Sequence, residues 1–156
     1  MKGNEALISS LNELLSDELS AINQYMVHSE MCDNWGYSRL HKSVEKRAID
    51  EMKHAEKLIA RILFLNGLPI VSKLKDLNIG AVPAQQINND MQSELGAIAA
   101  YNAAVKLAND VGDAGTRELL EDILEDEEEH LDWLEAQEDQ ISQMGVQIYL
   151  SGQTRE

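Results

Sequence analysis

Two Glu-x-x-His motifs, each preceded by a distant glutamate, are the residues of this sequence best suited to chemistry. The two sets repeat at an offset of 76 residues: Glu18, Glu51 and His54, then Glu94, Glu127 and His130. Glutamate and histidine three residues apart face the same way on a helix. Carboxylate and imidazole together suit iron, manganese or zinc. Six such ligands exceed what one tetrahedral zinc needs, so the pattern predicts a centre of two metal ions.

All four glutamates interrupt apolar helical stripes, so they are expected inside the fold. Glu18, for example, continues a stripe that begins at Leu11, and Glu94 interrupts the stripe from Ile87. Buried ionised carboxylates are costly, and four together repel one another. Two metal cations would relieve them, with Glu51 and Glu127 bridging the ions and the other two glutamates terminal. The alternative is four surface glutamates on acidic helices, which the repeated spacing disfavours.

An internal repeat surrounds these residues. Residues 18–25 read ELSAINQY and residues 94–101 read ELGAIAAY, while DEMKHAEKL at 50–58 matches DEEEHLDWL at 126–134. Both matches have the same offset, which indicates a pseudo-twofold arrangement that builds one site from two halves. Tyr25 and Tyr101 are also related by the repeat, and their hydroxyls could hydrogen-bond carboxylates behind the metal ligands and so orient the ligands.

The elements that must position this site are helices. Apolar periodicity predicts helices over about 5–32, 37–66, 83–112 and 113–144, with a short fifth helix at 146–150. Gly67 is expected to cap the second helix, Pro83 to begin the third and Asp113 to cap the fourth. The 67–82 segment can extend about 50 Å at ~3.3 Å per residue, enough to follow a helix of about 45 Å. We therefore expect one all-α domain over residues 1–156, a four-helix bundle with one long crossover between helices two and three.

Composition excludes several functions. The chain has 156 residues and a formal charge of −15, which disfavours nucleic-acid and membrane partners. Its one cysteine, Cys32, is expected to be a buried filler in a reducing compartment, and the N-terminus has no signal-peptide pattern, so a cytoplasmic location is expected. His28 and His41 lack repeat counterparts and are expected in surface or interface packing.

Over nearly its whole length the chain resembles the bacterioferritins, a haem-binding branch of the ferritin family. The resemblance is carried by the opening MKG, the segments NWGYSRL, IDEMKHAEKLIARILFLNGLP and LEDILEDEEEHLDWLE, and the ending MGVQIYL. It implies a ferritin-like fold in which the six residues above form a ferroxidase centre with two iron ions per subunit. It also implies assembly through homodimers into a 24-subunit cage that oxidises Fe(II) with oxygen or hydrogen peroxide and stores the ferric mineral.

Met52 bears on the haem. Its repeat counterpart is Glu128, so the bundle itself does not require methionine here. The resemblance implies that haem b is shared between two subunits through Met52 and carries electrons inward, from a ferredoxin-type reductant, for iron release. Family members with a further iron site on the inner surface carry histidine four residues before Asp50, and Lys46 stands there in this chain.

Four alternatives remain open. A non-storing di-iron oxidase or peroxidase of the rubrerythrin type would be a small oligomer, although many such proteins carry a rubredoxin-like cysteine module that this sequence lacks. A haem-free ferritin would store iron without using Met52 as a ligand. A haem-binding structural subunit would have a broken ligand set, and a DNA-protecting mini-ferritin would place its metals between subunits.

Overall fold

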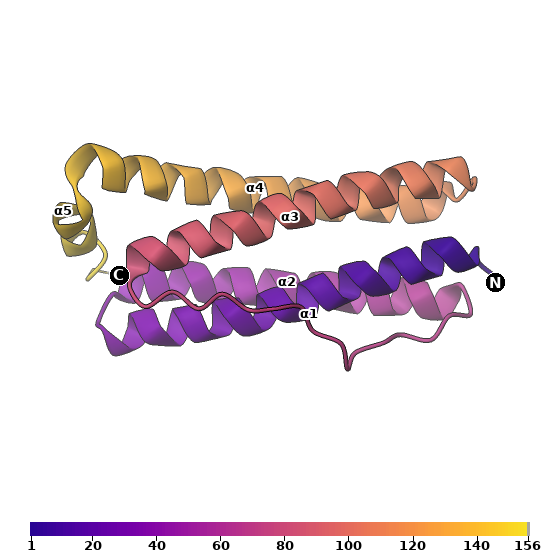
Figure 1. Cartoon of the computed structure of the whole chain (residues 1–156), viewed down its shortest axis with the longest axis horizontal. Coiled ribbons are helices and arrows are strands. Elements are labelled where there is room, and N and C mark those ends of the chain that lie inside the picture. The colour runs from indigo at the N-terminus through magenta and orange to yellow at the C-terminus, as the bar shows by residue number, and fades with distance from the viewer. Residues whose placement is uncertain (156) are drawn as a thin grey trace.

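The computed structural model describes residues 1–155 and shows two long helical hairpins packed into a four-helix bundle (Figure 1). The first hairpin pairs α1 with α2, and the second pairs α3 with α4. A short α5 closes one end of the bundle. The predicted all-α architecture is confirmed. The helices are α1 (Glu5–Asn34), α2 (Ser38–Phe64), α3 (Pro83–Asp110), α4 (Ala114–Met144) and α5 (Val146–Ser151).

Three of the helix ends share one hydrogen-bonding pattern. At each, the second residue past the helix adopts a left-handed backbone, as Gly36 (φ 83°), Asn66 (φ 59°) and Gly112 (φ 75°) do. The amide that follows bonds back over the last turn; the Gly67 amide, for instance, donates to the Ile62 carbonyl at 2.8 Å. The expectation that Gly67 supplies the left-handed cap of α2 is therefore wrong, because Asn66 does so. Gly67 is needed for space, since a Cβ there would lie 2.7 Å from Cγ2 of Ile8.

The helix starts follow the expected capping rules. The Asp113 carboxylate accepts the Thr116 amide at 3.0 Å, and Asn4 accepts the Leu7 amide at the start of α1. Pro83 occupies the first turn of α3. The Asp113 and Pro83 predictions are thus confirmed.

The crossover, residues 65–82, runs the length of the bundle beside α1 (Figure 1). Side chains at every fourth position of α1 bond to its backbone. Asn12 accepts the Ile70 amide at 2.8 Å. In the same order along α1, Ser16, Ser20, Gln24 and His28 bond to the backbone of Lys73, Lys75, Asn78 and Gly80. We call this set the ladder: Asn12, Ser16, Ser20, Gln24 and His28. It is the fixed path that makes a long crossover possible.

His28 lies inside the protein, not at its surface. Its ring is fully buried; Nδ1 lies 2.9 Å from Oδ1 of Asp90, and Nε2 accepts the Gly80 amide at 3.0 Å. The expectation of surface or interface packing is wrong for His28, because the crossover covers it. Cys32 is buried, as expected.

The core has two parts of different character. Between the metal-site glutamates and the end that holds the N-terminus lies a large apolar cluster that includes Leu14, Leu58, Ile62 and Leu120. Toward α5 the apolar cluster is small and includes Cys32 and Leu134. No helix in the described part of the chain is long and apolar enough to cross a membrane.

Candidate metal centre

The six predicted residues converge at mid-bundle, one carboxylate from each long helix plus a histidine from α2 and from α4. All are buried, with exposed fractions from 1% to 8%. Their ligand atoms form two overlapping groups in which all atoms lie within 4.8 Å of one another. Both groups contain Glu51 and Glu127. One is completed by Glu18 and His54 and the other by Glu94 and His130.

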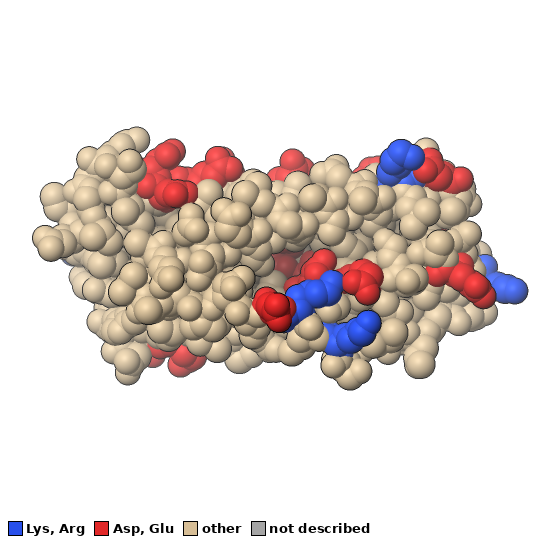
Figure 2. All heavy atoms as spheres, in the orientation of Figure 1, with Lys and Arg blue, Asp and Glu red and all other residues tan. Residues whose placement is uncertain are grey.

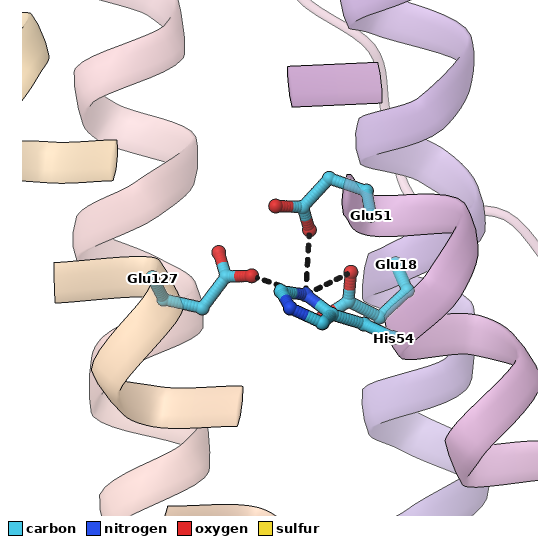
Figure 3. A group of neighbouring side chains, drawn as sticks. All are labelled: Glu18, Glu51, His54 and Glu127. Atoms are coloured by element: carbon cyan, nitrogen blue, oxygen red, sulfur yellow. Dashed lines mark ion pairs between the residues drawn. The ribbon is translucent and has the colours of Figure 1, made fainter. Parts of the chain in front are cut away.

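The histidines present Nδ1 to the carboxylates. Nδ1 of His54 lies 2.8 Å from Oε1 of Glu127 and 3.7 Å from Oε2 of Glu18, and the three glutamates of its group surround it from three helices (Figure 3). Nδ1 of His130 lies 3.0 Å from Oε1 of Glu51 and 3.7 Å from Oε1 of Glu94. Each group therefore offers one imidazole nitrogen and three carboxylates to a single point.

These residues have unsatisfied polar atoms. Among the described residues, seven buried side-chain nitrogen or oxygen atoms have no hydrogen-bond partner, and six of them belong to this site: one each from Glu18, Glu51, His54, Glu94, Glu127 and His130. The atoms are close enough for charge attraction but lack hydrogen-bond geometry. A buried polar group left unpaired costs about 1–3 kcal/mol. Two cations, one bound in each group, would satisfy all six atoms, so the donor set fits two metal ions.

The pKa values of these side chains also reflect the excess of buried carboxylates. Burial and the neighbouring carboxylate of Glu94 raise the pKa of Glu127 to about 9, and burial with repulsion from Glu18 raises the pKa of Glu51 well above its usual value. Burial opposes the charged form of His54, yet attraction to the nearby carboxylates of Glu127 and Glu18 raises its pKa to about 11. Without a cation, the centre therefore retains extra protons, which metal ions would displace.

Two tyrosine–glutamate hydrogen bonds hold glutamates of the centre in place. The Tyr25 hydroxyl donates to Oε1 of Glu94, and the Tyr101 hydroxyl donates to Oε1 of Glu18 at 2.5 Å. The repeat therefore orients its glutamates crosswise, each tyrosine serving the carboxylate of the other hairpin. The tyrosines therefore bond two of the predicted metal ligands directly, whereas the sequence pattern predicted bonds to carboxylates behind the ligands.

Two aspartates hold the histidines in the same crosswise way. Nε2 of His54 lies 2.8 Å from Oδ2 of Asp126, and Nε2 of His130 lies 3.1 Å from Oδ2 of Asp50. An Nε2–H bond to a carboxylate leaves Nδ1 free to bind a metal and makes it more basic. Sequence reasoning did not assign this role to either aspartate, although both precede the Glu-x-x-His motifs directly.

A cavity of about 280 Å³ connects the centre with the protein surface beside the crossover. Its inner wall includes Glu51 and Glu127, and its outer wall includes the exposed residue Lys75 together with Gln92. A small cation therefore has a direct approach from the outside.

Met52 lies outside this centre. Its side chain is 45% exposed on α2, and Ile49, one turn earlier, is 42% exposed. The Lys46 side chain is exposed as well, and Asp50 contacts His130. The structure thus brings together the six predicted metal residues and leaves Met52 on an outward apolar face.

Comparison with known proteins gives a consistent result. A family model for the ferritin-like domain of ferritins matches residues 8–144. A bacterioferritin of Mycolicibacterium paratuberculosis is 40% identical over 149 residues, which is 96% of this chain and 94% of that protein. Bacterioferritins of Rhodobacter capsulatus (40% over 147 residues, 94% of this chain and 91% of that one) and Brucella melitensis (38% over 149 residues, 96% and 92%) are similar.

Proposed function

This chain belongs to the bacterioferritins of the ferritin-like family, and we propose that it is an iron-storage ferroxidase whose catalytic residues and iron ligands are the six residues of the buried centre. The observation that carries the proposal is the set of orphaned atoms. Each of the six side chains contributes one buried atom without a hydrogen bond, and all lie within two groups of metal-binding size.

In this proposal two Fe(II) ions are the substrate. Glu51 and Glu127 bridge the ions because they alone belong to both groups, while Glu18 and Glu94 bind one ion each together with His54 and His130. Each Fe(II) gives up one electron. The pair reduces one hydrogen peroxide to water, or one oxygen to hydrogen peroxide, and the protons come from solvent.

The chain's own residues prepare this site. Tyr101 and Tyr25 hold one oxygen of Glu18 and of Glu94, which leaves the other oxygen of each for iron. Asp126 and Asp50 hold the two imidazoles so that Nδ1 points inward. Because the ligands are positioned before iron arrives, little reorganisation is needed on binding.

Storage follows from the family. Bacterioferritin relatives that match 96% of this chain support assembly of homodimers into a 24-subunit cage in the cytoplasm, in which the ferric product mineralises. Such a cage would have a mass of roughly 420 kDa, given a chain mass of 17.4 kDa. A ferredoxin-type protein is the proposed reductant for iron release.

We also propose that haem b binds between two subunits through Met52. The fit rests on the exposed thioether and on Ile49 beside it, which together offer an outward apolar face. Thioether ligation is one of the established ways to hold haem iron. When bound, the haem supplies a group that accepts and passes on single electrons. Met52→Leu should abolish a Soret band that co-elutes with the protein, without changing its elution volume.

A rubrerythrin-type oxidase or a haem-free ferritin would use the same six residues and differ in assembly or haem content. Size-exclusion chromatography with a full absorbance spectrum separates them. A particle of several hundred kilodaltons with a Soret band supports the full proposal, and a cage without the band, after haem is added back, supports the haem-free form. A dimer or tetramer would contradict storage.

The ferroxidase centre itself is tested by anaerobic Co(II) titration followed by aerobic Fe(II) oxidation. The wild type should bind two Co(II) per subunit at this centre. Glu127→Ala should lose both bound ions and slow oxidation more than about a hundredfold, because even residues behind metal ligands are worth ten- to hundredfold. Glu128→Ala, which removes the exposed neighbour on the same helix, is the matched control and should behave like the wild type.

A further inference from the structure

The cavity that leads to the centre is strongly acidic, and one cation stands at its rim. Among the described residues that line it, Lys75 alone is basic, whereas six are acidic: Asp17, Glu18, Glu51, Asp76, Glu94 and Glu127. Figure 2 shows acidic and basic side chains gathered around a hollow midway along this face, with acidic atoms set back inside it. Any cation that enters here passes the lysine.

Lys75 is anchored by its backbone, while its side chain is partly exposed to solvent. Its amide donates to Oγ of Ser20, a buried residue of the ladder, at 2.7 Å. Ser20 is itself fixed, because its hydroxyl donates to the Ser16 carbonyl at 2.7 Å. The Lys75 side chain, by contrast, is 45% exposed. The fold therefore fixes the backbone of this lysine, while its long side chain lies next to open solvent.

The ammonium group neutralises the outermost carboxylates. Nζ of Lys75 lies 2.9 Å from Oε2 of Glu13 and 3.2 Å from Oδ1 of Asp17. Asp17 directly precedes Glu18 and lines the same cavity. An ion pair this exposed to solvent is weak, so an arriving divalent cation can displace the ammonium group from Asp17.

We propose that Lys75 is a tethered counter-ion that controls the entry of Fe(II) from the outer surface into the centre. The proposal rests on the proposed function. With the ammonium group over the cavity, the local potential is less negative and Fe(II) enters slowly. When Fe(II) takes its place at Asp17, the lysine side chain swings into solvent and the path to Glu18 is open. Lys75 acts on binding and does not touch the reacting ions inside.

The proposal predicts a change in rate and no change in capacity. Removing one positive charge from the rim of the cavity should speed the entry of a divalent ion about threefold to tenfold. The effect should shrink as salt rises, because exposed charges are screened over about 8 Å at physiological ionic strength. The oxidation rate at saturating Fe(II) should not change, since the ligands are untouched.

The experiment uses the assembled wild-type protein and three variants. Lys75→Met removes the charge at nearly constant shape, and Lys75→Arg retains it. Lys106→Met is the matched control: it breaks a similar exposed ion pair, with Asp110 at 2.8 Å, on α3 and outside the cavity wall. Stopped-flow absorbance follows Co(II) binding without oxygen at low and high salt, and Fe(II) oxidation is then measured at limiting and saturating iron.

The expected result is faster Co(II) binding and faster oxidation at limiting iron in Lys75→Met alone, with all proteins converging at high salt. Wild-type rates in Lys75→Met, alongside normal binding of two ions, would overturn the entry role and leave the ferroxidase proposal intact. Slower binding, or equal acceleration in Lys106→Met, would also overturn it. A wild type that binds no Co(II) at the centre would overturn both proposals.

Discussion

The two ends of the bundle, on either side of the metal centre, are built on repeated positions but filled with opposite chemistry. Toward α5, Gln24, His28 and Asp90 form a buried hydrogen-bonded network, in which Asp90 bonds both of the others at 2.9 Å. Toward the N-terminus, the positions 76 residues away hold the apolar side chains Ala100, Ala104 and Leu14. The centre between them is the same in both repeats.

The difference shows which parts of the repeat are constrained by chemistry. Two ions need two equivalent ligand sets, so the glutamates, histidines, tyrosines and aspartates of the centre occur in both halves. At the two ends of the bundle, the interior needs only close packing and partners for its buried polar groups. At one end apolar packing does this. At the other, Gln24 and His28 also bond the crossover at Asn78 and Gly80, and so connect it through α1 to α3.

The largest expected effect comes from truncating a repeated leucine at each end. Leu58 lies in the large apolar cluster, and its counterpart Leu134 lies in the small one. Leu58→Ala should lower the free energy of unfolding by about 3–5 kcal/mol and Leu134→Ala by about 2–3 kcal/mol, because a larger packed cluster collapses less around a cavity. Urea denaturation at one fixed protein concentration measures both. Equal losses would show that the ends are equally well packed.

Without metal, the centre should make the stability of the whole bundle depend on pH. Glu127 has a pKa of about 9 in the fold, above its unfolded value, so between about pH 5 and 9 the folded metal-free protein retains a proton that the unfolded chain has lost. Its stability should therefore fall as pH rises through that window, and His54, with a pKa of about 11, adds a loss of the same sign at higher pH.

Filling the centre with metal should reverse this trend. A divalent ion at 100 to 1,000 times its dissociation constant should stabilise the fold by about 3–4 kcal/mol. It should also flatten the pH dependence, because bound metal replaces the protons. Calorimetric melting of the metal-free and Zn(II)-loaded protein from pH 5 to 9 tests this. A metal-free melting temperature that rises across the window would contradict the raised pKa of Glu127.

Breaking the polar network should cost less than a core cavity. Asp90→Leu leaves the Nδ1–H of His28 and the side-chain amide of Gln24 unpaired, so we expect a loss of about 2–3 kcal/mol. Adding Gln24→Ala and His28→Ala copies the apolar end and should recover at least half of this loss. The triple variant should still expose the Asn78 and Gly80 amides to faster hydrogen exchange. No recovery would mean that the two ends are not interchangeable.

The smallest effect is expected at the turns. At the polar end α1 is followed by the left-handed residue Gly36, whereas at the apolar end α2 is followed by Asn66 and α3 by Gly112. Asn66→Gly should stabilise the fold by up to about 1 kcal/mol, since glycine adopts this backbone without steric cost. Gly67→Ala should destabilise it, because its Cβ would meet Ile8. Thermal melting distinguishes the two signs, and a loss of stability in Asn66→Gly would contradict the role of Asn66 in this turn.

Periodicity and the repeat predicted most of the fold, with helix bounds within two residues of those observed. They also predicted which six residues meet, because charged side chains that recur on apolar stripes must be compensated by one another or by a shared ion. The ladder was missed. Its partners are backbone groups of the crossover, and spacing in one helix does not show what lies across from it, although Asn12, Ser16 and Ser20 already stand four residues apart.

Arg47 shows the other limit of sequence reasoning. It follows Lys46, and two adjacent basic residues look like a solvated run, yet the two side chains differ in burial. Lys46 is exposed, whereas Arg47 is buried with its guanidinium 4.6 Å from the centre of the Trp133 ring. Helix phase alone separates neighbours by about 100°, and only the position of α4 shows which of them meets an aromatic ring.

Because the ladder bonds the backbone of the crossover, the path of the crossover depends little on its own side chains. All five of its members bond to main-chain groups, so the outward side chains of the crossover do not set its route. Gly67 and Gly80 are exceptions, because a Cβ at either would lie within 2.7 Å of a neighbouring atom. The outward side chains are therefore free to diverge, much as loops do on a rigid antibody framework. Under the role proposed for Lys75, a single substitution in this segment would change how fast cations reach the centre and leave the fold unchanged.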